Sequence, residues 1–82
     1  MTVTVYGTTT CPFCKMEKAW LTEKAVMFKD IVVDEEPGAA EALLARSGQL
    51  SVPVTIVERD GKEEIVVGFD KTRLASLLGI AA

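Results

Sequence analysis

Two cysteines, Cys11 and Cys14, are the residues of this chain whose type and spacing can do chemistry. Pro12 and Phe13 separate them, and the sequence has no other cysteine and no histidine. A disulfide between them would close a ring of about one helical turn and would restrain little else. The lack of histidine excludes Ser-His-Asp and Cys-His catalysis, and we predict no metal site because zinc needs four ligands. We therefore interpret the pair as a redox-active dithiol.

The two cysteines lie where a predicted strand ends and a predicted helix begins. Residues 2–6 alternate β-branched and apolar side chains, and the residues from Pro12 to about Ala25 are mostly strong helix formers with one apolar face. The free N–H groups and positive end of this helix favour a thiolate at Cys11, which we predict to be the nucleophile. Cys14, one turn deeper, would then resolve the mixed disulfide formed at Cys11.

The other elements alternate along the chain. Strands are predicted at Val26–Val33, Val52–Val57 and Ile65–Val67, and helices at Ala39–Ala45 and Lys71–Leu78. Gly48 and Gly79 are predicted to end the two helices. The order β-α-β-α-β-β-α predicts one α/β domain over residues 1–82, with a mixed four-stranded sheet and helices on both faces.

The composition is that of a small folded domain. Of the 82 residues, 49% are apolar and 26% are charged, which argues against disorder, collagen-like repeats and coiled coils. The apolar runs fall far short of the ~20 residues of a membrane span, and the first fifteen residues do not form a signal peptide. A net charge of −3 argues against nucleic acid as a partner. We expect a cytoplasmic monomer that binds neither nucleic acid nor membrane.

Three segments carry a resemblance to a known family. They are Tyr6–Cys14, Ser51-Val52-Pro53-Val54 and Gly68-Phe69-Asp70, and they occur in the family's order over nearly the whole chain. On these segments the chain resembles the glutaredoxins and the closely similar NrdH-type redoxins. The resemblance implies a thioredoxin-like fold, a cis proline at position 53 beside the dithiol, and pairing of the Val52 backbone with the substrate.

Some positions depart from the glutaredoxin pattern. Glutaredoxins usually carry a lysine for a glutathione carboxylate at the position of Thr8, and a Gly-Gly pair where this chain has Val67 and Gly68. Gly-Phe at positions 68–69 is instead similar to the NrdH-type redoxins, which take electrons from thioredoxin reductase and donate them to ribonucleotide reductase. Cys-Pro-Phe-Cys is closer to the glutaredoxins. The electron donor, glutathione or thioredoxin reductase, therefore stays open.

The resemblance implies a set of substrate-binding residues around the dithiol: Thr8, Pro12, Phe13, Val52, Pro53, Gly68, Phe69 and Asp70. Asp70 is predicted both as the N-cap of the last helix and as a contact for the γ-glutamyl end of glutathione. Phe69 is expected to pack beside the dithiol or to contact a partner. Arg46 and Gln49 would either meet the glycyl carboxylate of glutathione or remain solvated, and we favour the solvated alternative.

The function that follows is thiol–disulfide exchange. Cys11 would attack a protein disulfide or a glutathione mixed disulfide, and Cys14 would resolve the product. Glutathione is a possible co-substrate, and no tightly bound cofactor is expected. The alternative implied by the family is a carrier that binds a 2Fe–2S cluster through Cys11 and glutathione. Proline after the first cysteine argues against this alternative.

One charged residue falls inside the apolar face of the first helix. Glu17 lies one turn beyond Cys14, where a carboxylate would relay the proton that Cys14 must lose. The interpretation we favour is that Glu17 leans out to water or pairs with a neighbouring lysine. Met16, Trp20 and Phe28 are predicted to lie in the core.

Overall fold

The computed structural model describes residues 1–81, and the elements of these residues follow the predicted order. The strands are β1 (Thr2–Gly7), β2 (Lys29–Val32), β3 (Val54–Arg59) and β4 (Lys62–Val67). The helices are α1 (Pro12–Glu23), α2 (Ala39–Ser47) and α3 (Lys71–Leu78). Gly48 and Gly79 end α2 and α3 in the left-handed conformation, as predicted.

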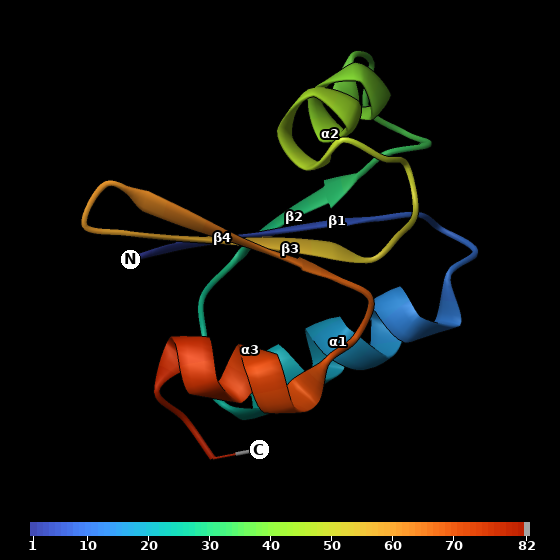
Figure 1. Cartoon of the computed structure of the whole chain (residues 1–82). Helices are drawn as coiled ribbons and strands as arrows, with labels where there is room; N and C mark the ends of the chain where they lie inside the picture. Colours follow the sequence, from blue (N-terminus) through green and yellow to red (C-terminus); the bar gives the residue numbers. More distant parts are fainter. Residues whose placement is uncertain (82) are drawn as a thin grey trace.

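The four strands form one mixed sheet in the order β2-β1-β3-β4. Strands β1 and β2 run parallel, whereas β1–β3 and β3–β4 are antiparallel pairs. Figure 1 shows α1 and α3 side by side on one face of the sheet and α2 on the opposite face. This arrangement confirms the predicted mixed sheet covered on both faces.

The core divides into two parts along the faces of the sheet. The larger part lies under α1 and α3 and contains Val3, Val5, Trp20, Leu21, Val57, Val66, Leu74, Ala75 and Leu78. The smaller part lies under α2 and contains Tyr6, Leu43, Val54 and Ile56. Successive residues of β1 and β3 point to opposite faces, so both strands are buried from both sides. The rigid centre of the sheet therefore supports the loop that follows β1.

Strand β2 is shorter than its sequence pattern predicts. It begins at Lys29 rather than at Val26. The chain leaves α1 through Ala25 in the left-handed conformation (φ 59°), and Met27 in the following connection is exposed. The apolar side chains of Val26 and Phe28 therefore lie in the connection between α1 and β2, where both pack against the core.

The β3–β4 hairpin differs from the prediction at both of its ends. Strand β3 begins at Val54 rather than at Val52, since Pro53 has no N–H to give to the ladder. The peptide bond between Val52 and Pro53 is cis, as the family resemblance implies. Asp60 and Gly61 both have positive φ, which suits the tight turn that the sequence predicts. Strand β4 starts directly after them, at Lys62 rather than at the predicted Ile65.

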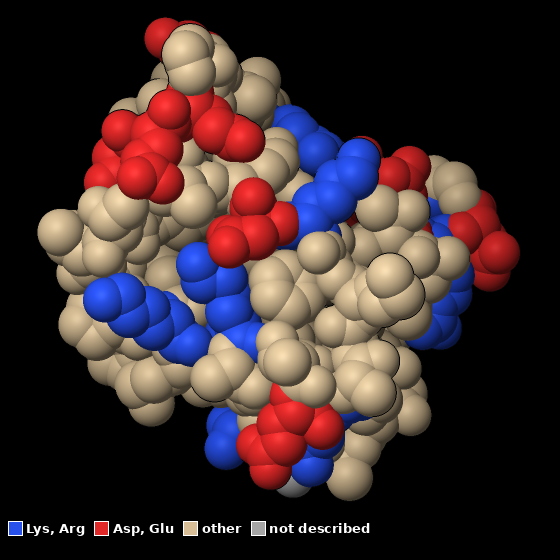
Figure 2. All heavy atoms as spheres, turned by 180° about the vertical axis from the view of Figure 1, so that it is seen from behind, with Lys and Arg blue, Asp and Glu red and all other residues tan. Residues whose placement is uncertain are grey.

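The surface mixes charges of both signs. On the face drawn in Figure 2, acidic side chains gather at the end of the molecule where α2 lies, and basic and acidic groups are interspersed elsewhere. This face has no broad basic surface of the kind that binds nucleic acid. Among the described residues, no helix has the length and apolarity to cross a membrane.

Candidate active site

Cys11 occupies the N-cap position of α1. Its backbone is extended (φ −95°, ψ 107°), Pro12 takes the first helical position, and the Cys11 Sγ accepts the N–H of Cys14 at 3.2 Å. The N–H of Cys11 in turn donates to the carbonyl of Thr8 at 3.5 Å. The side chain is half-buried, so a partner can reach the sulfur. The positive end of α1 and the Cys14 N–H both favour negative charge on this sulfur.

Cys14 lies one turn further, at 0% exposure. It packs against the end of β1, where a Cβ on Gly7 would lie 3.0 Å from both the Cβ and the Sγ of Cys14. A side chain at position 7 would therefore crowd the buried thiol. Burial, together with the side-chain interaction between the Cys14 thiol and Cys11, raises the pKa of the Cys14 thiol to about 11. Cys14 is therefore a thiol at neutral pH and is shielded from partners.

The loop before Cys11 is fixed to the segment after β2. The backbone N–H of Thr9 donates to Asp34 Oδ1 at 3.1 Å, and the Thr9 hydroxyl donates to Asp34 Oδ2 at 2.5 Å. These bonds hold the pKa of the Asp34 carboxyl below its usual value. The sequence carries no signal for this contact, because the two residues are 25 positions apart.

The loops flanking β3 and β4 lie at the same edge of the sheet as the cysteines. Tyr6 at the end of β1 pairs with Val54 at the start of β3, which pairs with Val67 at the end of β4. The connections beyond these residues therefore meet at one edge, as Figure 1 shows. The N–H of Gly68 donates to the carbonyl of the buried cis-Pro53 at 2.7 Å and fastens the two loops together.

The residues after Gly68 have well-defined structural roles. The ring of Phe69 meets that of Trp20 edge-on, with centroids 5.9 Å apart and an interplanar angle of 61°. This confirms packing as one role of Phe69. The carboxylate of Asp70 accepts the N–H of Arg73 at 3.1 Å, which confirms Asp70 as the N-cap of α3.

The structure gathers all the predicted substrate-binding residues at this one edge of the sheet: Thr8, Pro12, Phe13, Val52, Pro53, Gly68, Phe69 and Asp70. Phe13, beside Cys11, is 60% exposed, and Val52 is half-buried. An exposed aromatic ring two residues from Cys11 would suit a protein partner. Substrate binding by these residues stays a prediction.

Arg46 and Gln49 are occupied by contacts within the protein. Arg46 donates to the hydroxyl of Tyr6 at 3.4 Å and to the carboxylate of Glu63 at 3.1 Å. The amide oxygen of Gln49 accepts the backbone N–H of Ser51. Neither side chain is simply solvated, so the interpretation that we favoured from the sequence does not describe them.

The interpretation that we favoured for Glu17, an outward side chain in water, is wrong. Its side chain is 0% exposed and accepts a hydrogen bond from the hydroxyl of Thr55 on β3. Met16, which we predicted in the core, is instead 54% exposed. The buried face of α1 contains Cys14, Glu17 and Trp20, and Met16 lies outside this face. Trp20 is in the core as predicted, and Phe28 packs against the core.

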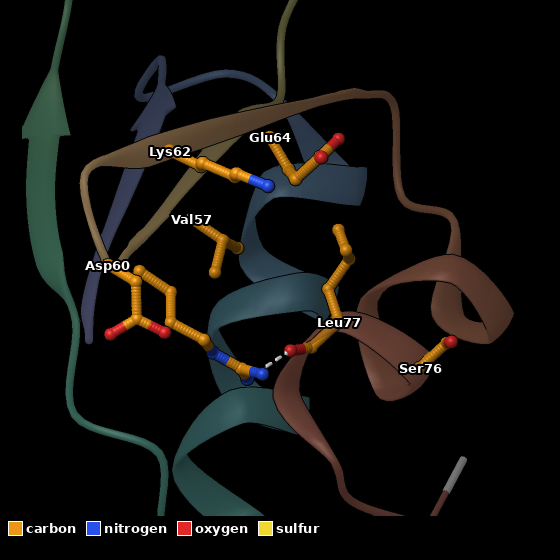
Figure 3. A pocket seen from close by; sticks show the side chains of 7 residues that line it. Val57, Asp60, Lys62, Glu64, Ser76 and Leu77 are labelled. Carbon is orange, nitrogen blue, oxygen red and sulfur yellow. Dashed lines mark hydrogen bonds between the residues drawn. The ribbon is translucent and has the colours of Figure 1, made fainter.

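A cavity of about 300 Å³ lies between the β3–β4 hairpin and α3. The guanidinium of Arg59 donates to the carbonyl of Leu77 at 2.6 Å across this cavity. Figure 3 shows side chains from the hairpin, such as Lys62 and Glu64, and Leu77 from α3 around it. The hairpin is at the opposite end of β3 from Pro53, so the cavity is remote from the cysteines. None of the predicted site residues lines it. Its lining consists of Val57, Arg59, Asp60, Lys62, Glu64, Ser76 and Leu77.

Comparison with known proteins gives a consistent result. The family model described as Glutaredoxin matches residues 3–62. A glutaredoxin-like 8.6 kDa protein encoded in the rubredoxin operon of Clostridium pasteurianum is 36% identical over 76 residues, covering 93% of this chain and 96% of the relative. The glutaredoxin-like protein NrdH of Lactococcus lactis subsp. cremoris is 33% identical, covering 92% of this chain and 97% of the relative.

The solved structures agree with the sequence relatives. The glutaredoxin-like NrdH-redoxin from Escherichia coli superposes with a TM-score of 0.76 at 30% identity, covering 94% of this chain and 95% of that chain. The fold is therefore thioredoxin-like, as the family resemblance implied. Since the family model spans most of the chain and the relatives match it nearly end to end, the chain belongs to the glutaredoxin family.

Proposed function

We propose that this protein is a dithiol electron carrier that reduces disulfide bonds in other proteins. The observation that carries the proposal is the asymmetry of the two cysteines. Cys11 is reachable, and its sulfur accepts a backbone N–H at the positive end of a helix. Cys14 is fully buried, and its pKa is raised to about 11. One sulfur is thus ready to attack, while the other is held back for a second step.

The reaction would proceed by two exchanges. The Cys11 thiolate attacks one sulfur of the substrate disulfide, the substrate S–S bond breaks, and the first substrate thiolate leaves and takes up a proton. Cys14 then loses its proton and attacks Cys11 Sγ, which forms the Cys11–Cys14 bond and releases the second substrate thiolate. Two electrons have moved from the dithiol to the substrate. An external reductant returns two electrons and two protons.

We propose thioredoxin reductase, rather than glutathione, as the electron donor. Position 8 carries Thr8 in place of a lysine, and Arg46 is held by Tyr6 and Glu63. The side chains that would receive the carboxylates of glutathione are therefore missing or occupied. A relative also supports this choice, because the NrdH-redoxin from E. coli is described as having a thioredoxin-like activity profile. Ribonucleotide reductase is a candidate substrate by the same likeness to NrdH.

The test compares two reducing systems on the oxidised protein. NADPH with thioredoxin reductase should restore two free thiols, whereas glutathione with its reductase should act more slowly. The opposite order would assign glutathione and overturn the proposed donor.

Reduction of insulin should disappear in Cys11→Ser. Cys14→Ser should stop at a mixed disulfide with the substrate, which is visible by mass. Turnover by Cys11→Ser at the wild-type rate would refute the role of the dithiol.

A further inference from the structure

A buried carboxyl group, that of Glu17, lies one turn beyond Cys14 and has no part in the exchange steps described above. Its Oε2 accepts the hydroxyl hydrogen of Thr55, while Oε1 has no hydrogen-bond partner among residues 1–81. The whole side chain is at 0% exposure. Burying a carboxyl group with one oxygen unpaired costs folding free energy, so packing alone does not account for it.

The reactive group that lies next to Glu17 is the thiol of Cys14. Cys14 and Glu17 are three residues apart on the buried face of α1, which makes them neighbours on the helix. Thr55 on β3 is a neutral hydroxyl. The core cluster that α1 shares with the other elements is apolar, with Val5 from β1, Val66 from β4 and Leu74 from α3. A charge on Glu17 acts on Cys14 and opposes its thiolate.

Cys14 needs a proton acceptor at the moment when it attacks. The thiolate is the attacking species in disulfide exchange, and Cys14 begins as a thiol. Water cannot serve directly, because the side chain has no exposed surface. Glu17 is a buried carboxyl group at a neighbouring position with an unpaired oxygen.

We propose that Glu17 accepts the proton of the Cys14 thiol when Cys14 resolves the mixed disulfide at Cys11. The S–H proton passes to the Glu17 carboxylate, the Cys14–Cys11 S–S bond forms, and the bond from Cys11 to the substrate breaks. The substrate leaves as a thiolate and takes its proton from solvent. When the reductant later opens the disulfide, Glu17 returns the proton to Cys14. This inference rests on the proposed dithiol function and names the residue that enables its second step.

The basicity of Glu17 suits this role. Burial raises the pKa of the carboxyl group above its ordinary 4.5, and the hydrogen bond from Thr55 opposes part of that rise. A carboxylate with a raised pKa is a stronger base than one at the surface. No charged side chain contributes to this shift, so burial and Thr55 alone set it.

The two steps can be timed separately with one equivalent of dithiobis(nitrobenzoate), an aromatic disulfide that releases a coloured thiolate. Attack by Cys11 releases the first thiolate, and resolution by Cys14 releases the second. In Glu17→Gln the first release should keep its rate, while the second should slow by roughly 10²-fold, the lower end of what general base catalysis contributes. Glu23→Gln is the matched control, because it removes the same charge from an exposed position on the same helix. It should change neither release.

The pH dependence gives a readout that a structural role would not move. In the wild type, the second release should accelerate as Glu17 loses its proton, and Glu17→Gln should lack this rise. Thr55→Val removes the hydrogen bond that lowers the pKa of Glu17, so the rise should move to higher pH. Glu17→Gln keeps a side chain of the same shape and can still accept the Thr55 hydroxyl, which favours a folded variant.

The outcomes are distinguishable. Equal rates of second release in Glu17→Gln and Glu23→Gln would overturn the assignment of Glu17, and so would an equal slowing of both releases, which marks a folding defect. An unchanged pH profile in Thr55→Val would also overturn it. If the wild type released no thiolate at all, the proposed function itself would fail, and the inference with it.

Discussion

Replacing Gly7 by alanine should disturb the packing of the buried Cys14 thiol. Gly7 is not among the glycines with positive φ, so alanine can adopt its backbone conformation. The cost therefore comes from contact alone. The new Cβ would lie 3.0 Å from both the Cβ and the Sγ of Cys14, which is too close for undisturbed packing. Overpacking of this kind costs about 1–3 kcal/mol.

Urea unfolding of the reduced protein measures this cost. For a domain of this size, 1 kcal/mol lowers Tm by about 4–8 °C, so thermal unfolding should show the same loss. Cys14→Ala provides the matched background, because it removes the sulfur and leaves only the Cβ contact. Gly7→Ala should cost less in that background, with a coupling of about 0.5–3 kcal/mol between the two substitutions. A wild-type stability for Gly7→Ala, or an equal cost in both backgrounds, would show that the added Cβ does not crowd the Cys14 sulfur.

Three further predictions concern stability. Asp70→Ala removes the N-cap of α3 and should lower the free energy of unfolding by about 1 kcal/mol in urea, and an unchanged midpoint would contradict the cap. The pKa of Asp34 is lowered, so its bonds to Thr9 should stabilise the protein above pH 3.8 and be lost as the pH falls below that value. Asp34→Asn should flatten this part of the stability profile, measured by unfolding in acid. The pKa of Glu17 is raised, so the folded state holds its proton more tightly than the unfolded state, and stability should fall as the pH rises above 4.5. Glu17→Gln should not share that fall, and parallel profiles for the two proteins would count against a buried ionisable group.

The dithiol and its helix were accessible from the sequence because their signals are local. Cys11 precedes Pro12, and a run of helix formers follows a strand pattern, so the cap position of Cys11 follows from neighbouring residues alone. The cis conformation before Pro53 came from the family resemblance, since nothing in the local sequence dictates it. The order of strands and helices could also be predicted, because apolar residues are spaced differently along strands and along helices.

The features that the sequence could not supply depend on distant partners. The helical period placed Glu17 on the apolar face, but the cost of burying a carboxyl group argued for an outward position. The hydroxyl that makes burial tolerable belongs to Thr55, 38 positions away. Met16 is apolar yet exposed, because the helix buries only the line through Cys14 and Trp20. Such outcomes are decided by packing between elements rather than by the composition of one.

The most direct test of the roles assigned to the two cysteines is selective alkylation of the reduced, folded protein at neutral pH, followed by peptide mass mapping. We expect iodoacetamide to label Cys11 to completion while Cys14 remains unlabelled until the protein is unfolded. The prediction follows from the accessible, N–H-bonded sulfur of Cys11 and from the burial and raised pKa of Cys14. Labelling of both cysteines at equal rates, or of Cys14 first, would contradict the division of roles between attacking and resolving sulfur.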